Sequence, residues 1–413
     1  MSEKLAEVYE QYDMEILSTK KGRGATILNT TDGFRILEPF RGSMVRLEQE
    51  YVLKQLFLKE GCSNLDYLIP NKEGQLFTCD KYRQPFVLKK HFEGNECDMH
   101  NPSDIVRAVE ALARFHIYGK RVAVCFLDAW QDAQLEKERK RIAEIKRAIV
   151  DGEELERLAY IYEISQNALE EVLDSESMKG TEPLGTSDNE NKKTTRAIDD
   201  MGKGKEIDSE IKNTFIRHNK ELKKIKNYVT KVKRKNAFET LFLQVFSDYY
   251  RQGAQCVERL SHVLNIEQDI SGEHTFQRHY GICHGSYNQH NVIMNEEEEA
   301  IVHFEKFSRG NQLNDLYQFA RKAMEKNHFD FVLLKDIFGA YSVKIELSKE
   351  DYQYMYVLFS YPEKFWKIAN SYYNTNKAFL SPKYSEKLET VIQQETEKLT
   401  MLEAYHACYI SDE

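Results

Sequence analysis

The chain has 413 residues, of which 41% are hydrophobic and 12% aromatic, enough for two or three domains with cores of their own. Its formal net charge of −9 argues against a general nucleic-acid-binding protein. The seven cysteines form no C-x-x-C pair, so we expect free thiols. The start has no apolar signal segment, and no uncharged run approaches the ~18 residues of a membrane span. We therefore expect a cytoplasmic protein.

Residues 1–92 have the pattern of a small sheet with one helix. Two β-like runs flank Asp32-Gly33, which is a strong hairpin signal. A helical stripe follows, formed by Leu47, Val52, Leu53, Leu56 and Phe57, and Gly61 is placed to end that helix. The segment 74–92 then predicts a second hairpin. The expected order is strand, strand, helix, strand, strand.

The remainder is mostly helical in pattern. Asn101-Pro102-Ser103 is a helix-start signal. Residues 131–173 are charged, with apolar residues at roughly heptad spacing, whereas 174–208 are polar and Gly-rich and are expected to be disordered. Helix resumes after 208, and the two helical stretches suggest a long hairpin. Its basic run, 217–235, is typical of a solvated helix face, with a docking surface for acidic partners or an anionic membrane as the alternative.

The segment 281–294, GICHGSYNQHNVIM, contains the frame H-G-x-x-x-x-x-N that small-molecule kinases use for a catalytic base and a metal-binding Asn. Phosphoryl transfer needs a group that orients or deprotonates the acceptor hydroxyl, and oxygen ligands for Mg²⁺. Asn291 is retained as a possible metal ligand, but Ser286 stands where the basic carboxylate is needed. A serine hydroxyl is no anionic base near neutral pH. We interpret His284 as a loop-packing histidine and Asn291 as a loop-bracing amide.

The next predicted strand, AIVHFEKF, carries His303 where a second metal-binding carboxylate is expected. Imidazole is a poor Mg²⁺ ligand, because Mg²⁺ prefers hard oxygens. Glu305 would point to the same side of such a strand, displaced by ~6–7 Å along it. The metal site is therefore expected to be degenerate.

The N-terminal segment offers a similar departure. The strand after Gly33 should carry a phosphate-binding lysine, yet the residue at that position is Glu38, with Arg35 as the alternative cation. Glu50, in the following helix, is the expected partner of such a lysine. We expect this nucleotide-binding position to be degenerate as well.

Three segments, ICHGSYNQHNVIM, VHFEKF and NDLYQFARKAMEKN, together resemble the spore coat protein S (CotS) family of spore-forming Firmicutes. This family is a branch of the aminoglycoside phosphotransferase and choline kinase-like superfamily. The segment HNKELKKIKNYVTKVKRKNAFETLF resembles its inserted helical hairpin, and only 174–208 falls outside the resemblance. The resemblance implies that Asp315, in NDLYQF, steadies the catalytic loop.

The resemblance implies an α+β, bilobal protein-kinase-like fold. We expect an N-lobe over 1–92, a hinge and first C-lobe helix over 93–130, a charged helical insertion over 131–236, and the rest of the C-lobe over 237–413. The expected function is a catalytically inactive scaffold that binds spore coat or morphogenetic proteins, located in the mother-cell cytoplasm and then in the coat. The alternatives are an active ATP-dependent phosphotransferase and a nucleotide-binding pseudokinase sensor. No cofactor is expected unless an alternative holds, in which case ATP and Mg²⁺ are.

Overall fold

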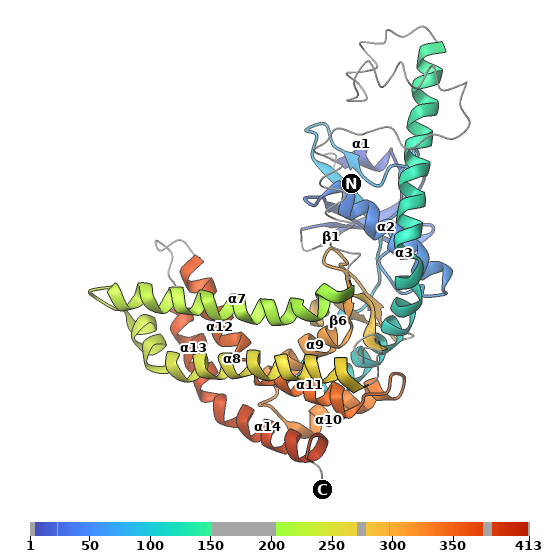
Figure 1. Ribbon diagram of the computed structural model, residues 1–413. Helices are drawn as coiled ribbons and strands as arrows, with labels where there is room; N and C mark the ends of the chain where they lie inside the picture. Colours follow the sequence, from blue (N-terminus) through green and yellow to red (C-terminus); the bar gives the residue numbers. More distant parts are fainter. Residues whose placement is uncertain are drawn as a thin grey trace.

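A computed structural model describes residues 5–22, 24–150, 204–270, 278–296, 298–374 and 382–411. A small N-terminal lobe built on a sheet lies above a larger, mostly helical C-terminal lobe (Figure 1). None of the helices in the described part of the chain is long and apolar enough to cross a membrane. The sequence predicts that 174–208 are disordered. Residues 174–203 lie outside the described residues, but 204–208 are not disordered as predicted, because they form the start of a helix, Gly204–Lys231.

The N-lobe is a five-stranded antiparallel sheet in the order β1-β2-β3-β5-β4. Its elements are α1 (Ala6–Tyr9), β1 (Ile16–Lys21), β2 (Thr26–Thr30), β3 (Gly33–Pro39), α2 (Met44–Lys59), β4 (Thr78–Cys79) and β5 (Pro85–Lys90). Both predicted hairpins are confirmed, since β2 pairs with β3 across Thr30 and Gly33, and β4 pairs with β5. The edge strand β1 was not predicted. None of its side chains is fully buried, so the sequence has no apolar alternation there.

Helix α2 packs the N-lobe against the C-lobe. Leu53 and Phe57 of the predicted stripe are fully buried, and the Phe57 ring stacks on Phe115 at 5.0 Å. Gly61 ends the helix as predicted, with a φ of +91°. The amide of Cys62 bonds the carbonyl of Phe57, which is the hydrogen-bond pattern of a glycine-terminated helix.

The C-lobe has two small sheets near the candidate site, β10-β7 and β6-β8-β9, and is otherwise helical in the described residues. Its strands are β6 (Asn95–Glu96), β7 (Tyr280–Cys283), β8 (Val292–Met294), β9 (Ala300–Ile301) and β10 (Ser308–Asn311), with a short 3₁₀ helix, η4 (Gln289–Asn291). Its helices are α3 (Pro102–Val150), α7 (Gly204–Lys231), α8 (Ala237–Ile270), α9 (Leu313–Lys326), α10 (Phe331–Ser342), α11 (Lys349–Ser360), α12 (Glu363–Asn374), α13 (Lys383–Gln393) and α14 (Glu395–Tyr409).

Helix α3 is continuous across residue 130, where the sequence predicts that the insertion begins, and it rises beside the N-lobe in Figure 1. Trp130 is its last buried side chain among the described residues of the helix. Beyond Trp130 the helix leaves the core but still contacts α2, since Lys137 pairs with Glu48 at 2.7 Å.

Helices α7 and α8 form an antiparallel hairpin that packs on the C-lobe (Figure 1). The apolar stripe of α7 is buried against α8 and α12, and α13 packs on α8 and α12. The shared core consists of Leu222, Ile225, Val229, Phe238, Phe242, Phe246, Tyr249, Phe365, Ile368, Ala369, Tyr372, Leu388 and Val391. The basic residues of α7 therefore surround a face that the C-lobe itself covers.

Candidate functional site

The loop after β7 has the backbone that a catalytic loop requires. Gly285 has a φ of +72°, and a Cβ added there would lie 2.0 Å from the carbonyl oxygen of Lys306. Only glycine fits this position, because it alone tolerates both the left-handed conformation and the close backbone approach. The backbone geometry thus explains the glycine of the motif.

Asp315, in the first turn of α9, forms hydrogen bonds to the backbone of this loop. Its carboxylate accepts hydrogen bonds from the backbone amides of His284 at 2.6 Å and Gly285 at 2.9 Å. The buried His116 lies at 3.5 Å from the same carboxylate and bonds Tyr341 through its other ring nitrogen. A carboxylate bound to two amides fixes the conformation of the loop.

His284 is fully buried, and both of its ring nitrogens are used within the loop. Nε2 donates to the carbonyl of Val302 at 2.9 Å, so it carries the proton. Nδ1 then accepts from the amide of Ser286 at 3.2 Å. Burial lowers the pKa of His284, so the imidazole is neutral near pH 7. With neither nitrogen free, His284 has no lone pair to offer a substrate.

Asn291 binds the loop that carries Ser286. Its side-chain amide donates to the Ser286 carbonyl at 2.9 Å, and the Asn288 amide reaches the same oxygen at 2.6 Å. The loop is therefore tied by its own side chains, with Ser286 at the position that a kinase gives to a carboxylate.

The expectation that His303 and Glu305 share a strand is wrong. Strand β9 ends at Ile301, because pairing with β8 covers only two residues, and His303 has a φ of +67°. Without a neighbouring strand the backbone turns, which brings His303 Nδ1 to 3.7 Å from Glu305. The nearby Glu305 carboxylate raises the pKa of His303 above its usual value.

The predicted metal ligands can be compared with the oxygen ligands that Mg²⁺ prefers. Among the residues that the structure describes, no group of three or more His, Cys, Asp or Glu could hold a metal ion. The amide of Asn291 faces a carbonyl, and His303 supplies an imidazole. These residues do not fit Mg²⁺·ATP as a kinase would hold it.

A group of charged side chains joins the two lobes, and we call it the interlobe cluster. It consists of Glu38, Glu50, Lys54, Asp66, Lys89 and Glu305. Lys89, on β5, is at its centre, with distances from Nζ of 3.3 Å to Glu305, 3.5 Å to Glu38, 3.7 Å to Asp66 and 3.9 Å to Glu50. The cation near Glu38 thus comes from β5 rather than from β3.

Lys54, the second cation of the cluster, is fully buried and lies 2.5 Å from Glu50 and 2.6 Å from Asp66. Glu50 therefore pairs with lysines, as predicted for its helix position, but these come from α2 and β5. Arg35, the alternative cation, instead binds the carbonyls of Asp32 and Phe34 in its own hairpin.

The charges of the interlobe cluster stabilise one another. Burial alone lowers the pKa of Lys89, but Asp66 and the other carboxylates outweigh burial and raise it above its ordinary value. Burial raises the pKa of Asp66, while Lys54 and Lys89 together bring it below its ordinary value. Lys89 is therefore charged at neutral pH, and Asp66 is ionised.

Three members of the cluster, Lys54, Asp66 and Lys89, were missed from the sequence. Lys54 could have been found, because Glu50, Leu53, Lys54 and Phe57 lie on one face of a helix at i, i+3, i+4 and i+7. A lysine on an apolar face needs a buried partner. Nothing local indicates that Lys89 contacts Glu305, which is 216 positions away.

The comparison with known proteins supports the fold. No protein-family model matches the sequence, and no curated protein matches it. Among solved structures, an aminoglycoside phosphotransferase from Alicyclobacillus acidocaldarius is similar, with a TM-score of 0.64 and 12% identity over 96% of this chain and 94% of that chain. A spectinomycin phosphotransferase solved with ADP and spectinomycin has a TM-score of 0.50 and 11% identity over 97% of each chain. At such identities the likeness concerns the fold, and the chain has the bilobal protein-kinase-like fold that the sequence predicts.

Proposed function

We propose that this chain is a pseudokinase of the spore coat protein S (CotS) family, a kinase-fold scaffold that binds other coat proteins and transfers no phosphate. The observation that carries the proposal is Ser286, at the base position of a loop whose supports are otherwise intact. The assignment to the spore coat is supported by the sequence resemblance alone.

The surroundings of Ser286 offer no replacement base in the loop itself. A general base must have a free lone pair within hydrogen-bond reach of the acceptor hydroxyl. His284 is neutral with both ring nitrogens engaged. Glu305 is the carboxylate on which an active enzyme would depend, and it is paired with Lys89 and close to His303.

The interlobe cluster favours a scaffold over a catalyst. Lys89 lies where its charge is neutralised by internal carboxylates, so a nucleotide phosphate would have to displace them. Further contacts bind the lobes together, since Arg46 donates to the carbonyl of Phe307 and Asp66 accepts from the amide of His303 at 3.0 Å. A fixed arrangement of lobes is useful for binding a partner, whereas kinase turnover requires opening and closing.

A thermal-shift experiment on the purified chain with ATP, with and without Mg²⁺, tests the proposal. A ligand at ~100 times its Kd adds about 2.7 kcal/mol of stability, which is visible as a rise in Tm. We expect no shift at millimolar nucleotide. A Mg²⁺-dependent shift followed by phosphate transfer would establish the active phosphotransferase instead, and a Mg²⁺-independent shift would establish the nucleotide sensor.

The location is tested separately. A fluorescent fusion expressed in a sporulating Firmicute should be diffuse in the mother cell and then form a ring around the forespore. A fusion that stays diffuse through spore release would contradict the coat assignment without bearing on catalysis.

A further inference from the structure

The helical hairpin has a basic outer surface to which the proposed scaffold function assigns no role. Residues 217–235, which include the second half of α7 and the turn before α8, contain seven lysines and two arginines but only one acidic residue. The formal charge of this segment is therefore +8, and that of the remaining chain is −17. Such a separation of charge gives the molecule one positive region within a negative field.

Four of these basic residues form a line along α7, which we call the basic ridge: Arg217, Lys220, Lys224 and Lys231. Spacings of three, four and seven residues place them on one side of the helix. All four are exposed, and their side is opposite to the apolar stripe that the C-lobe covers. At 1.5 Å per residue the basic ridge is about 21 Å long. In Figure 1, α7 lies along the edge of the C-lobe, and its C-terminal end points away from the N-lobe.

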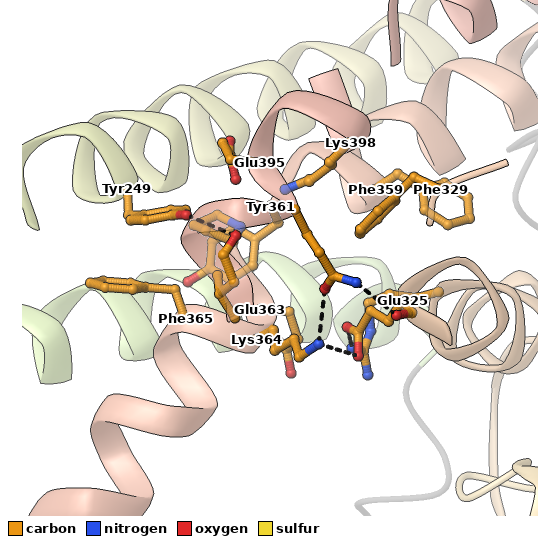
Figure 2. Close-up of a pocket in the computed structure, with 14 residues that line it drawn as sticks. Tyr249, Glu325, Phe329, Phe359, Tyr361, Glu363, Lys364, Phe365, Glu395 and Lys398 are labelled. Atoms are coloured by element: carbon orange, nitrogen blue, oxygen red, sulfur yellow. Dashed lines mark hydrogen bonds and ion pairs between the residues drawn. The ribbon is translucent and has the colours of Figure 1, made fainter. Parts of the chain in front are cut away.

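The charges of the basic ridge are not balanced within the described part of the chain. None of its four side chains forms an ion pair with a carboxylate there. Glu221, the one acidic residue of the segment, instead accepts a hydrogen bond from the Trp366 side chain of α12 at 2.8 Å. Inside the C-lobe, by contrast, a cation such as Lys364 has a carboxylate beside it, since it lies 3.7 Å from Glu325 (Figure 2).

The composition and shape of the basic ridge favour a flat anionic surface over a protein partner. Protein interfaces are enriched in arginine and depleted in lysine, which is a strongly hydrated point charge. Three of the four ridge residues are lysines. The surface of a helix is convex, so a row of charges on it can lie against a plane but cannot enclose a small anion.

An aromatic side chain lies among these cations. Tyr228 is between Lys224 and Lys231 on the same side of α7, and it is 44% exposed. Its ring packs edge-on against Tyr373 of α12 at a centroid distance of 5.5 Å. Tyrosine rings are common at the level of lipid headgroups, because one end of the ring is apolar and the other is polar.

We propose that the basic ridge binds the surface of an anionic lipid bilayer, with α7 parallel to the membrane plane and its cations beside the lipid phosphates. The apolar stripe of α7 remains in the C-lobe core, so the attachment is electrostatic and reversible. The same surface repels the negative remainder of the chain, which orients the ridge toward it. The proposal goes beyond the scaffold function and does not depend on whether the chain binds nucleotide.

Co-sedimentation of the full chain with lipid vesicles tests the proposal. We expect binding to vesicles of equal parts phosphatidylcholine and phosphatidylglycerol, and none to phosphatidylcholine alone. Raising the salt concentration from about 0.1 M to about 1 M shortens the Debye length from about 10 Å to about 3 Å and should release the chain. The full chain is used so that its own acidic residues compete with the vesicle in the measurement.

Substitutions locate the binding surface. Each cation near an anionic leaflet strengthens binding by about fivefold. Arg217→Gln, Lys220→Gln, Lys224→Gln and Lys231→Gln together should therefore weaken binding by about a hundredfold or more. Lys220→Gln with Lys224→Gln should weaken it by about tenfold or more, and this pair decides if the larger variant fails to fold. The matched control replaces four exposed lysines of other elements by Gln and should bind nearly as well as the unaltered chain: Lys59, Lys326, Lys335 and Lys344.

Three results would overturn the proposal. The first is equal binding to the two kinds of vesicle. The second is a loss for the control variant as large as that for the ridge variants, or no loss for the ridge variants. The third is release from anionic vesicles by soluble poly-glutamate at an equal concentration of charge, because the basic ridge would then prefer an acidic polypeptide.

Discussion

Replacing Lys89 by Met tests whether the interlobe cluster holds the fold together. The Lys89 side chain is 4% exposed, and without it four carboxylates would face Lys54 alone. Coulomb's law with an effective dielectric constant of 20 gives about 4.5 kcal/mol for a pair at the 3.7 Å between Lys89 and Asp66. Removing one partner of a buried pair typically costs ~3–5 kcal/mol. We therefore expect Lys89→Met to lower the free energy of unfolding by about 3–5 kcal/mol.

The matched variants separate burial from charge. Glu305→Gln removes a partner whose side chain is 57% exposed, so its expected cost is only ~0.2–1 kcal/mol. Lys90→Met alters the next residue of β5, which is only partly buried and bonds the carbonyl of Ser63, and should cost about 1 kcal/mol or less.

Urea unfolding followed by circular dichroism and by fluorescence is the assay, and coincident transitions are needed for a two-state analysis. A loss for Lys89→Met no larger than that for Lys90→Met would refute the reasoning. It would mean that water, rather than Lys89, balances the carboxylates of the cluster.

The same cluster predicts how stability depends on pH. The folded-state pKa of Lys89 lies above its unfolded value, so its contribution is complete below about pH 10.4 and is lost as the pH rises through the folded pKa. The folded-state pKa of Asp66 lies below its unfolded value, so its contribution is present above about pH 3.9 and is lost as the pH falls through the folded pKa. Lys89→Met should remove the alkaline loss, and an unchanged alkaline arm would contradict this assignment.

Three further predictions concern the loop and its neighbours. Gly285→Ala should destabilise the chain by more than ~1 kcal/mol in urea unfolding. Gly61→Ala should cost less, because Gly61 also has a positive φ but a Cβ added there would have no atom within 4 Å. Equal costs would exclude the close backbone contact at Gly285 as the cause. Asp315→Asn should cost ~1.5–3 kcal/mol in the same assay, because two backbone amides lose a charged acceptor, and a neutral effect would mean that they bond water equally well. Because the pKa of His303 is raised, its stabilising contribution is complete below about pH 6.5 and is lost as the pH rises through the folded pKa. Glu305→Gln should return the pKa of His303, measured by NMR, toward about 6.5. An unchanged pKa would exclude Glu305 as the cause.

The hairpin turn at Asp32-Gly33, the end of α2 and the buried face of α2 could be predicted from the sequence, because residues adjacent in the chain determine them. Asp32-Gly33 supplies the positive φ of a tight turn, and Gly61 does the same at the end of α2. The apolar stripe of α2 is set by the helical period, and Leu53 and Phe57 are buried as that period requires. The bilobal fold itself was predicted from several short motifs that resemble a kinase-like family. Each motif is weak alone, but together they follow one another in the order expected of that fold.

The prediction failed where a segment depends on distant neighbours. Strand β1 has no apolar face of its own and exists because β2 offers backbone partners. The strand expected to carry His303 and Glu305 ends at Ile301 because β8 is too short to pair with it.

The electrostatic core of the candidate site was decided by tertiary structure. Sequence order places a carboxylate, Glu38, where a cation is expected, but folding brings Lys89 from the adjacent strand and Glu305 from the other lobe to the same point. Charge pairing acts through space over a few ångströms, so positions far apart in the chain determine it together.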